Sequence, residues 1–230
     1  MRLKPFFSFY GAKYRLAPLY PPPKYDYVVE PFAGSAQYAT MYFDHNVRLY
    51  EKDPIIFGVW DFLIKASPND IRLLPDVVES VDQLTCCQEA KSLIGFWLNH
   101  ASASPKKTMS KWGRDPKKAK DFWGKNKIEM LLGQVEKIKH WQVFNKGYEQ
   151  ADIGVATYFI DPPYQDKGKF YRYGCGGINF PALGSWVMGL SGQAIVCENM
   201  GADWLPFTPL KSIHGARKRN MEAVFLKEMP

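Results

Sequence analysis

Short apolar runs alternate with helically spaced apolar residues near both ends of the chain. Runs rich in β-branched and aromatic residues predict strands; they cover residues 25–29, 47–50, 141–144, 155–160, 193–197 and 223–227. Helical spacing predicts helices over residues 36–43, from residue 53 onward and over residues 182–190. This rhythm of strands and helices predicts the α/β class with an open sheet.

The rhythm lapses between residues 67 and 149. Ser67-Pro68-Asn69-Asp70 predicts a turn that starts a helix, and residues 81–97 and 128–139 have helical spacing. The strand pattern returns after residue 150. We therefore predict a core formed by residues 1–66 and 150–230, interrupted by an inserted, mainly helical subdomain at residues 67–149.

The strand predicted at residues 155–160 ends in Asp161-Pro162-Pro163-Tyr164. Pro162 lacks a backbone donor, and Pro163 restricts Pro162 to an extended conformation, so the strand stops in a stiff turn. In open α/β sheets ligands bind at the carboxyl ends of the strands. The turn is a candidate site on that edge, although a plain surface turn has the same sequence. The loop at residues 165–177 is long enough to move over such a site.

A second candidate turn follows the first predicted strand. Glu30-Pro31-Phe32-Ala33-Gly34-Ser35-Ala36 resembles the strand–turn–helix geometry that presents backbone N–H groups to a nucleotide. The G-x-G-x-x-G pattern is absent, so a dinucleotide is not expected. Glu51 ends the next strand, where an acid can accept hydrogen bonds from ribose hydroxyls or stay solvated in a loop. Together the two features predict an adenosine moiety without phosphates.

Phe6-Phe7-Ser8-Phe9-Tyr10-Gly11-Ala12-Lys13-Tyr14 is an aromatic cluster that ends with a small-residue pair and a lysine. Its rings have the composition of an arm that packs on the core. In the functional interpretation, Gly11 lets the backbone approach a ligand and Lys13 meets a carboxylate or phosphate.

Composition predicts a well-packed protein with an anionic partner. Apolar residues make up 46% of the 230 residues, and the net charge is +7. Residues 101–127 hold nine Lys or Arg residues against two Asp, an excess equal to that of the whole chain, with Trp112, Phe122 and Trp123 among them. A solvated charge run is the simpler interpretation, but the aromatic content favours nucleic-acid contact. The predicted contacts are Lys106, Lys107, Lys111, Trp112, Arg114, Lys117 and Lys118.

Cysteine and histidine spacing predicts no metal site. The four cysteines show no C-x-x-C pattern, and the four histidines are scattered. We expect reduced thiols and a soluble, cytoplasmic protein, since neither a signal peptide nor a membrane span is recognisable. No membrane partner is expected, and the chain is expected to be a monomer or a weak dimer.

The order of the motifs resembles that of the Dam-like adenine-N6 DNA methyltransferases. Phe9-Tyr10-Gly11-Ala12-Lys13 comes first, the turn at residues 30–36 second, and Asp161-Pro162-Pro163-Tyr164 last, with the basic insert before it. The likeness extends over most of the chain. Ala12 and Ala36 stand where many relatives have glycine, and Glu30 replaces a common aspartate. The insert lacks the Phe-Asn-x-Pro-Phe-Gly segment of GATC readers, so the likeness does not extend to that recognition sequence.

The resemblance implies a Rossmann-like core that uses S-adenosylmethionine and an insert that recognises double-stranded DNA. It implies adenine-N6 methylation of a flipped base in a bacterial or phage-infected cell, in or outside a restriction–modification system. The implied cofactor contacts are Phe9, Tyr10, Lys13, Glu30, Phe32, Gly34, Glu51 and Asp161. The implied catalytic residues, which would hold the target base, are Asp161, Pro162 and Tyr164.

Two alternatives remain open at this stage. One is methyl transfer to an RNA base or to a protein amide or amine; those families usually carry Asn at the position of Asp161. The other is a catalytically silent DNA-binding relative that keeps the fold without turnover.

Overall fold

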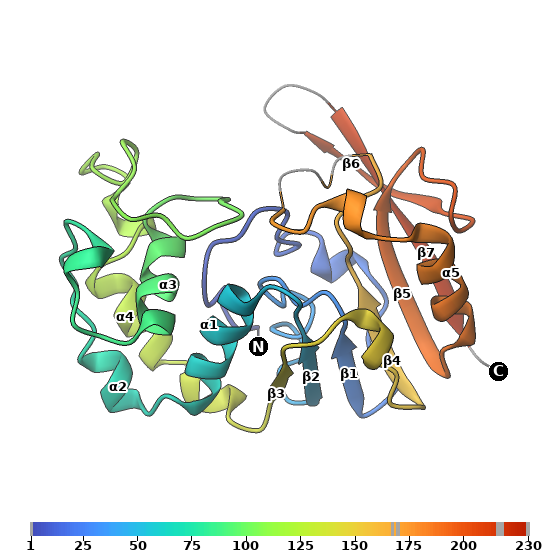
Figure 1. The fold of residues 1–230 in the computed structure, drawn as a ribbon, viewed down its shortest axis with the longest axis horizontal. Helices are drawn as coiled ribbons and strands as arrows, with labels where there is room; N and C mark the ends of the chain where they lie inside the picture. The colour runs from blue at the N-terminus through green and yellow to red at the C-terminus, as the bar shows by residue number, and fades with distance from the viewer. Residues whose placement is uncertain (1, 167, 169–170, 215–218, 229–230) are drawn as a thin grey trace.

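The computed structural model describes residues 2–166, 168, 171–214 and 219–228. Within these residues, seven strands form one mostly parallel sheet in the order β3-β2-β1-β4-β5-β7-β6 (Figure 1). The strands are β1 (Tyr27–Glu30), β2 (Asn46–Tyr50), β3 (Gln142–Phe144), β4 (Ala156–Ile160), β5 (Gly192–Asn199), β6 (Thr208–His214) and β7 (Arg219–Glu228). The first five in spatial order are parallel, and β7 runs antiparallel to both β5 and β6.

Five α-helices accompany the sheet in the described part of the chain. They are α1 (Pro54–Lys65), α2 (Pro68–Arg72), α3 (Gln88–Trp97), α4 (Lys125–Leu132) and α5 (Phe180–Gly189). Short 3₁₀ segments lie at Ala17–Leu19, Val81–Gln83, Ala119–Asp121, Val135–Ile138, Tyr148–Gln150 and Cys175–Gly177. The fold is therefore mixed α/β, and its sheet is compatible with a Rossmann-like core. No helix among these is long and apolar enough to cross a membrane.

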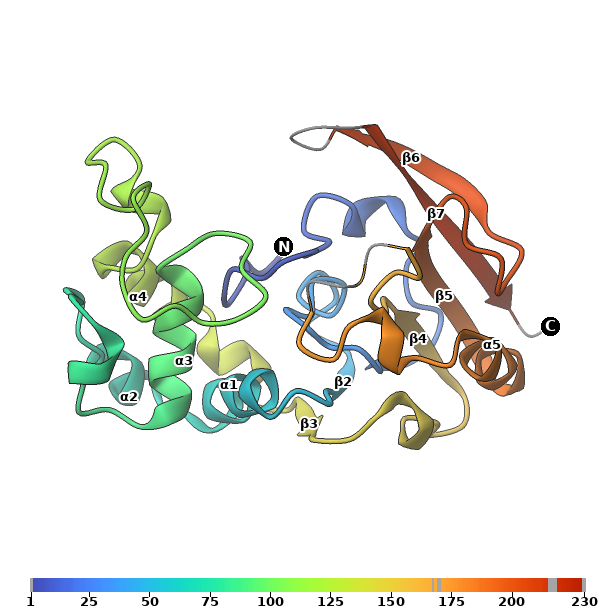
Figure 2. The same cartoon turned by 45° about the horizontal axis from the view of Figure 1, so that its top comes forward.

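Alternate residues of the central strands face two separate cores, as strand geometry requires. Val28 of β1 belongs to one apolar cluster and Val29 to the other. The N-terminal arm, α1 and α3 cover the first face, and α5 covers the second. Figure 2 shows α5 beside β5, on the opposite side of the molecule from α3 and α4.

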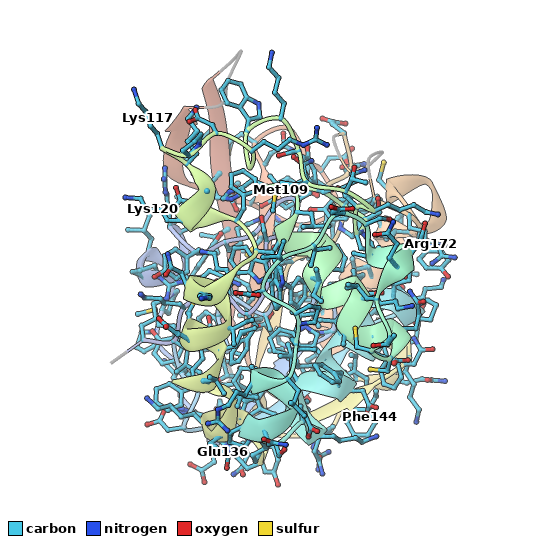
Figure 3. The ribbon with its side chains drawn as sticks, turned by 90° about the vertical axis from the view of Figure 1, so that its left-hand side faces the viewer. Met109, Lys117, Lys120, Glu136, Phe144 and Arg172 are labelled. Atoms are coloured by element: carbon cyan, nitrogen blue, oxygen red, sulfur yellow. The ribbon has the colours of Figure 1, made fainter. Side chains whose placement is uncertain are left out.

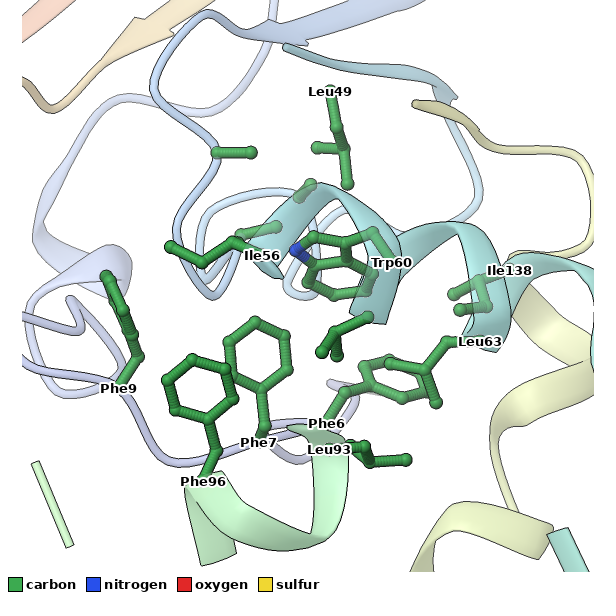
Figure 4. Close-up of a cluster of buried hydrophobic side chains, with 14 of the residues drawn as sticks. Phe6, Phe7, Phe9, Leu49, Ile56, Trp60, Leu63, Leu93, Phe96 and Ile138 are labelled. Atoms are coloured by element: carbon green, nitrogen blue, oxygen red, sulfur yellow. The ribbon is translucent and has the colours of Figure 1, made fainter. Parts of the chain in front are cut away.

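Residues 67–149, which the sequence predicts as an insert, share one apolar core with the sheet. Figure 4 shows rings of the N-terminal arm between α1 and α3, with Trp60 at the centre. The Trp60 ring meets Phe6 and Phe7 edge-on, each at 5.5 Å between centroids. Phe7 also contacts Phe96 of α3 at 5.1 Å. The aromatic arm thus packs on the core between α1 and α3, as its composition predicted.

Local sequence explains where α1 and α2 begin. The Asp53 side chain accepts a hydrogen bond from the Ile55 amide, and Pro54 occupies the first turn of α1. Ser67 and Asp70 form the reciprocal pair of hydrogen bonds of a capping box at α2. Both helix starts were predicted from the sequence and are confirmed.

The helix predicted at residues 36–43 is wrong. The structure describes all of these residues and places them in successive turns. Ala36 has a φ of 45°, which lies in the left-handed region. A helix would join the Ala39 amide to the Ser35 carbonyl. Instead, the Glu30 carboxylate accepts from Ala39 and the Gln37 side chain donates to Ser35.

Two helices in the insert are shorter than predicted. The helical pattern at residues 81–97 yields a 3₁₀ turn followed by α3, because Leu84 and Cys87 adopt extended backbone. The helix predicted at residues 128–139 begins earlier, at Lys125, and stops at Leu132. Gln134 leaves helical geometry there, and its side chain bonds to both backbone groups of Lys4.

The edge strand β6 was not predicted. Its sequence contains Pro209, which removes a ladder donor and reads as a strand breaker in the interior of a sheet. At an edge the missing donor faces no partner strand, so proline is tolerated. The strand predicted at residues 223–227 is the second half of the longer β7.

Candidate functional site

A pocket lies at the carboxyl ends of the central strands, where the sheet order reverses. From β1 the chain continues outward to β2 and β3, and it then crosses to β4 and β5 on the other side. Such switch points are the usual ligand sites of open α/β sheets. Counted together with the open solvent at its mouth, the pocket holds about 1070 Å³ of space free of atoms.

All eight residues that the sequence assigned to a cofactor line this pocket. They come from the N-terminal arm, the turn after β1, the end of β2 and the end of β4: Phe9, Tyr10, Lys13, Glu30, Phe32, Gly34, Glu51 and Asp161. Four segments that are far apart in sequence therefore converge on one cavity.

Lys13 and Asp161 form an ion pair at the base of this site. Lys13 Nζ lies 2.9 Å from Asp161 Oδ1, and the two side chains are only 8% and 20% exposed. Burial alone would lower the pKa of Lys13, but the carboxylates of Asp161 and Glu222 outweigh that effect and raise it. The lysine therefore stays charged at neutral pH.

The pKa of Asp161 is raised toward neutral pH. Burial raises its pKa to about 6, although the ammonium group of Lys13 lowers it, and Glu222 and Glu198 add to the rise. At pH 7 most molecules carry an ionised Asp161. The carboxylate is thus an available acceptor whose charge is sensitive to its neighbours.

Glu51 is tied to the turn after β1. Its Oε2 accepts from the Gly34 amide at 3.0 Å, and its Oε1 accepts from the Asp53 amide at 2.9 Å. Burial nevertheless raises the pKa of Glu51 to about 7, against these hydrogen bonds. Each oxygen keeps a second lone pair, so the carboxylate can still accept from a hydroxyl.

Glu30 lines the pocket but also has a structural role. Its side chain is buried and accepts from the Ala39 amide at 2.7 Å, which fixes the loop that replaces the expected helix. Burial raises its pKa well above the usual range for a carboxyl.

Gly34 and Gly11 are small because the site is crowded. Gly34 has a φ of 45°, and a Cβ there would come within 3.3 Å of the Phe9 ring. Gly11 has a φ of 74°, and a Cβ there would meet the Tyr171 hydroxyl at 2.1 Å. Both positions favour glycine through backbone conformation and through space.

Pro162 and Tyr164 lie behind the pocket rather than in the lining drawn from the described residues. The Tyr164 hydroxyl donates to Glu222 Oε1 in a short hydrogen bond. Lys13 Nζ sits 4.7 Å from the centre of the Tyr164 ring. The ring is therefore engaged by protein groups, and it can stack on a base only after a change of position.

The seven residues assigned to DNA contact are all exposed on the insert, away from the pocket. Figure 3 shows Lys117 and Lys120 at the edge of the insert, pointing away from its body. Lys118 Nζ lies 3.9 Å from the centre of the Trp112 ring, which is 62% exposed. Lys107 pairs with Asp82 at 2.8 Å.

Phe122 and Trp123, which lie in the same basic segment, are buried. The Trp123 indole donates to the Pro75 carbonyl. Of the three aromatics in the segment, Trp112 is thus the one that remains available to a base.

Several residues of the site were given no cofactor or catalytic contact from the sequence. Tyr148 stacks on Phe32 at 5.5 Å between ring centres and lines the pocket. Tyr171 and Arg172 belong to the loop after β4; Arg172 reaches Asp53 at 3.3 Å. The aromatic and basic content of residues 165–177 was the available signal for these two. Glu222 is one of many acids in the chain, and no sequence pattern distinguishes it.

The pocket is acidic although the protein is basic. Five acidic and three cationic side chains line it, namely Glu30, Glu51, Asp53, Glu149 and Asp161 against Lys13, Lys52 and Arg172. Within the described ranges no group of three or more His, Cys, Asp or Glu residues is arranged to hold a metal ion. By formal charge, the lining therefore has two more acidic than cationic side chains.

Comparison with known proteins gives no family assignment. No family model matches the chain, and no curated protein matches it. Among solved structures, the chain is similar to a conserved hypothetical protein from Streptococcus pyogenes, with 12% identity and a TM-score of 0.38. The match covers 88% of this chain and 86% of that one, and at this TM-score it adds nothing to the interpretation of the site.

Proposed function

We propose that the protein is an adenine-N6 DNA methyltransferase that uses S-adenosylmethionine. The observation that carries this proposal is the convergence of three separated motifs on one pocket at the switch point of the sheet. The order of these motifs along the chain resembles that of adenine-N6 DNA methyltransferases.

Two features of the pocket suit the donor, namely its position on the sheet and its acidic lining. Glu51 lies at the end of the strand next to β1, where a ribose acceptor is expected. The excess of carboxylates complements a cation. When bound, the donor would supply an electrophilic methyl group on a positively charged sulfonium.

Asp161 supplies the acceptor that the chemistry requires. The exocyclic nitrogen of adenine is a poor nucleophile because its lone pair is delocalised into the ring. An ionised Asp161 that accepts one amine hydrogen favours a pyramidal nitrogen and stabilises the positive charge that develops there. The Pro162 carbonyl is proposed to accept the second hydrogen. Fixed acceptors of this kind commonly contribute several kcal/mol.

The basic loops of the insert are proposed to hold the duplex. Adenine is out of reach inside a helix, so the base must leave the stack at a cost of a few kcal/mol. Exposed lysines near Trp112 can contact phosphates, and the indole can contact a base. The loop at Ala101–Ser104 connects the two sites, because Ser102 accepts from the Tyr10 amide and Ala103 lines the pocket.

Transfer of a tritiated methyl group tests the proposal directly. Purified protein is incubated with labelled donor and, separately, with duplex DNA, RNA and a protein extract. We expect label in DNA only, recovered as N6-methyladenine after digestion. Label in RNA or protein would show that the methyl acceptor is not DNA. Donor binding without transfer to any of the three would identify a catalytically silent protein. Single-molecule sequencing of DNA from expressing cells then gives the sequence context.

A further inference from the structure

Glu222 lies behind the catalytic motif on β7, a strand to which the sequence assigned no function. Its backbone pairs with Asn199 of β5 and with Lys211 of β6, and its side chain is only 4% exposed. It does not belong to the pocket lining among the described residues. A carboxylate this deeply buried requires partners.

Three groups from separate parts of the chain converge on one oxygen of Glu222. The Tyr20 hydroxyl donates to Oε1 at 2.8 Å, and the Tyr164 hydroxyl donates to the same atom. Burial raises the pKa of both tyrosines, so both keep the proton that they donate. Lys13 Nζ lies 3.8 Å away, which is too far for a hydrogen bond but close for a charge interaction.

Lys13 therefore lies between two carboxylates. It is 2.9 Å from Asp161 and 3.8 Å from Glu222. If Asp161 were its only partner, the full ammonium charge would act on the acceptor. Glu222 offsets part of that charge and also repels the charge of Asp161 itself.

We propose that Glu222 is a positioning residue that divides the charge of Lys13 and thereby sets the ionisation and acceptor strength of Asp161. This inference rests on the proposed function for its meaning in catalysis, but the charge coupling exists independently of it. Glu222 also orients Tyr164, so one side chain of β7 arranges two groups of the predicted catalytic motif.

Glu198 also adds to the rise in the pKa of Asp161, but among the described ion pairs Lys13 joins only Asp161 and Glu222. Glu198 of β5 is fully buried, and its two oxygens accept from Gln165, Asn199 and Trp204. Burial raises the pKa of the neighbouring Cys197 thiol far above neutrality, so this group is uncharged. Burial likewise raises the pKa of Tyr171 above its usual value. Glu222 is the carboxylate beside Lys13 that competes with Asp161.

The test is a carboxyl NMR titration of Asp161 in the full chain, without donor or DNA. The signal is assigned by its loss in Asp161→Asn. In Glu222→Gln, the amide oxygen still accepts from both tyrosines, but the negative charge is gone. We expect the pKa of Asp161 to fall by about 0.5–1 unit, because a repelling charge that shares Lys13 with it has been removed.

Glu228→Gln is the matched control. Glu228 lies on the same strand, but it is exposed and pairs with Lys24. We expect the Asp161 titration to stay at its wild-type position in this variant. Should Glu222→Gln not fold, Glu222→Asp carries the same test: its charge lies one methylene farther from Lys13, so the Asp161 pKa falls by a smaller, measurable amount.

An Asp161 titration that is identical in wild type and Glu222→Gln overturns the inference, whether or not the protein methylates DNA. If Glu222 had only a structural role, Glu222→Gln would lower the melting temperature and leave the Asp161 titration curve unchanged. If the wild type transfers methyl groups, the acid limb of its kcat/KM profile is expected to move by the same amount in Glu222→Gln. A moved titration without methyl transfer would keep the coupling and refute the proposed function instead.

Discussion

The pocket and the basic loops of the insert are opposite in charge and exposure. The pocket gathers buried carboxylates around Lys13, whereas residues 101–127 carry an excess of exposed lysine and arginine. Charges in the pocket interact through a medium of low polarity, so their pKa values shift. Charges on the loops face water and salt, and each contributes little by itself.

Because of this difference, substitutions in the two regions are expected to have different effects. In the pocket, each functional group is held in a fixed position, so single substitutions are expected to have large effects on activity. On the loops, many similar charges act together and can replace one another. The same contrast fits a division of labour in which the pocket carries out the chemistry and the loops supply affinity for a polyanion.

Among the substitutions in the pocket, Asp161→Ala is expected to cause the largest loss of methyl transfer. The substitution removes the acceptor of the target amine and leaves the buried Lys13 without its closest partner. We expect methyl transfer to fall by about a thousandfold or more, measured as tritium in DNA at saturating donor.

Folding should survive the same change because Glu222 remains beside Lys13, and nonspecific DNA binding should survive because the basic loops proposed to contact DNA lie outside the pocket. Circular dichroism and a fluorescence anisotropy titration at low salt provide these controls. Turnover close to the wild-type rate would refute the assignment of Asp161.

Donor affinity should depend on pH in a direction fixed by the raised pKa values. A cation favours ionised carboxylates, and the pKa of Glu51 is raised to about 7 and that of Asp161 to about 6. Binding at pH 6 must therefore expel protons, so affinity is expected to rise about tenfold between pH 5.5 and 7.5. Calorimetry in two buffers of different ionisation enthalpy measures both the affinity and the protons released.

The demethylated thioether product sharpens this prediction, because it lacks the sulfonium charge. Its affinity should change less over the same range. Equal pH dependence for donor and product would show that the carboxylates do not sense the charge of the ligand.

The pocket could be predicted closely from the sequence because its residues follow from local rules. Strand ends are marked by turn chemistry at Glu30, Glu51 and Asp161, and parallel strands bring their ends to one edge. The likeness of motif order added the N-terminal arm. Together these place all eight predicted residues around one cavity without any knowledge of long-range contacts.

The remaining features depend on contacts that a local pattern does not encode. The helix expected after Gly34 is absent because Glu30 and Gln37 capture the backbone groups it would have used. Glu222 reaches Lys13 across more than two hundred positions of sequence. In the insert, composition predicted exposure correctly for Trp112, but it could not separate that ring from the buried Trp123.

Neutralising lysines tests whether the basic loops supply affinity for DNA. Lys117→Gln with Lys118→Gln is expected to lower DNA affinity about fivefold at 0.15 M salt. The slope of log affinity against log salt should become shallower by about two counterions. Lys24→Gln with Lys65→Gln removes the same charge from exposed sites elsewhere and serves as the control. If both pairs change the slope equally, affinity reflects net charge and not the insert.

Substitution of the Tyr164 hydroxyl is expected to have the smallest effect on turnover. Its ring faces Lys13 and its hydroxyl donates to Glu222, so Tyr164→Phe removes one of two tyrosine donors from that carboxylate. We expect kcat to fall about twofold to threefold, since the Tyr20 hydrogen bond and the ring remain. Tyr164→Ala removes the ring as well and should raise KM for DNA. Equal losses in both variants would mean that the hydroxyl, through Glu222, matters more than any stacking on the target base.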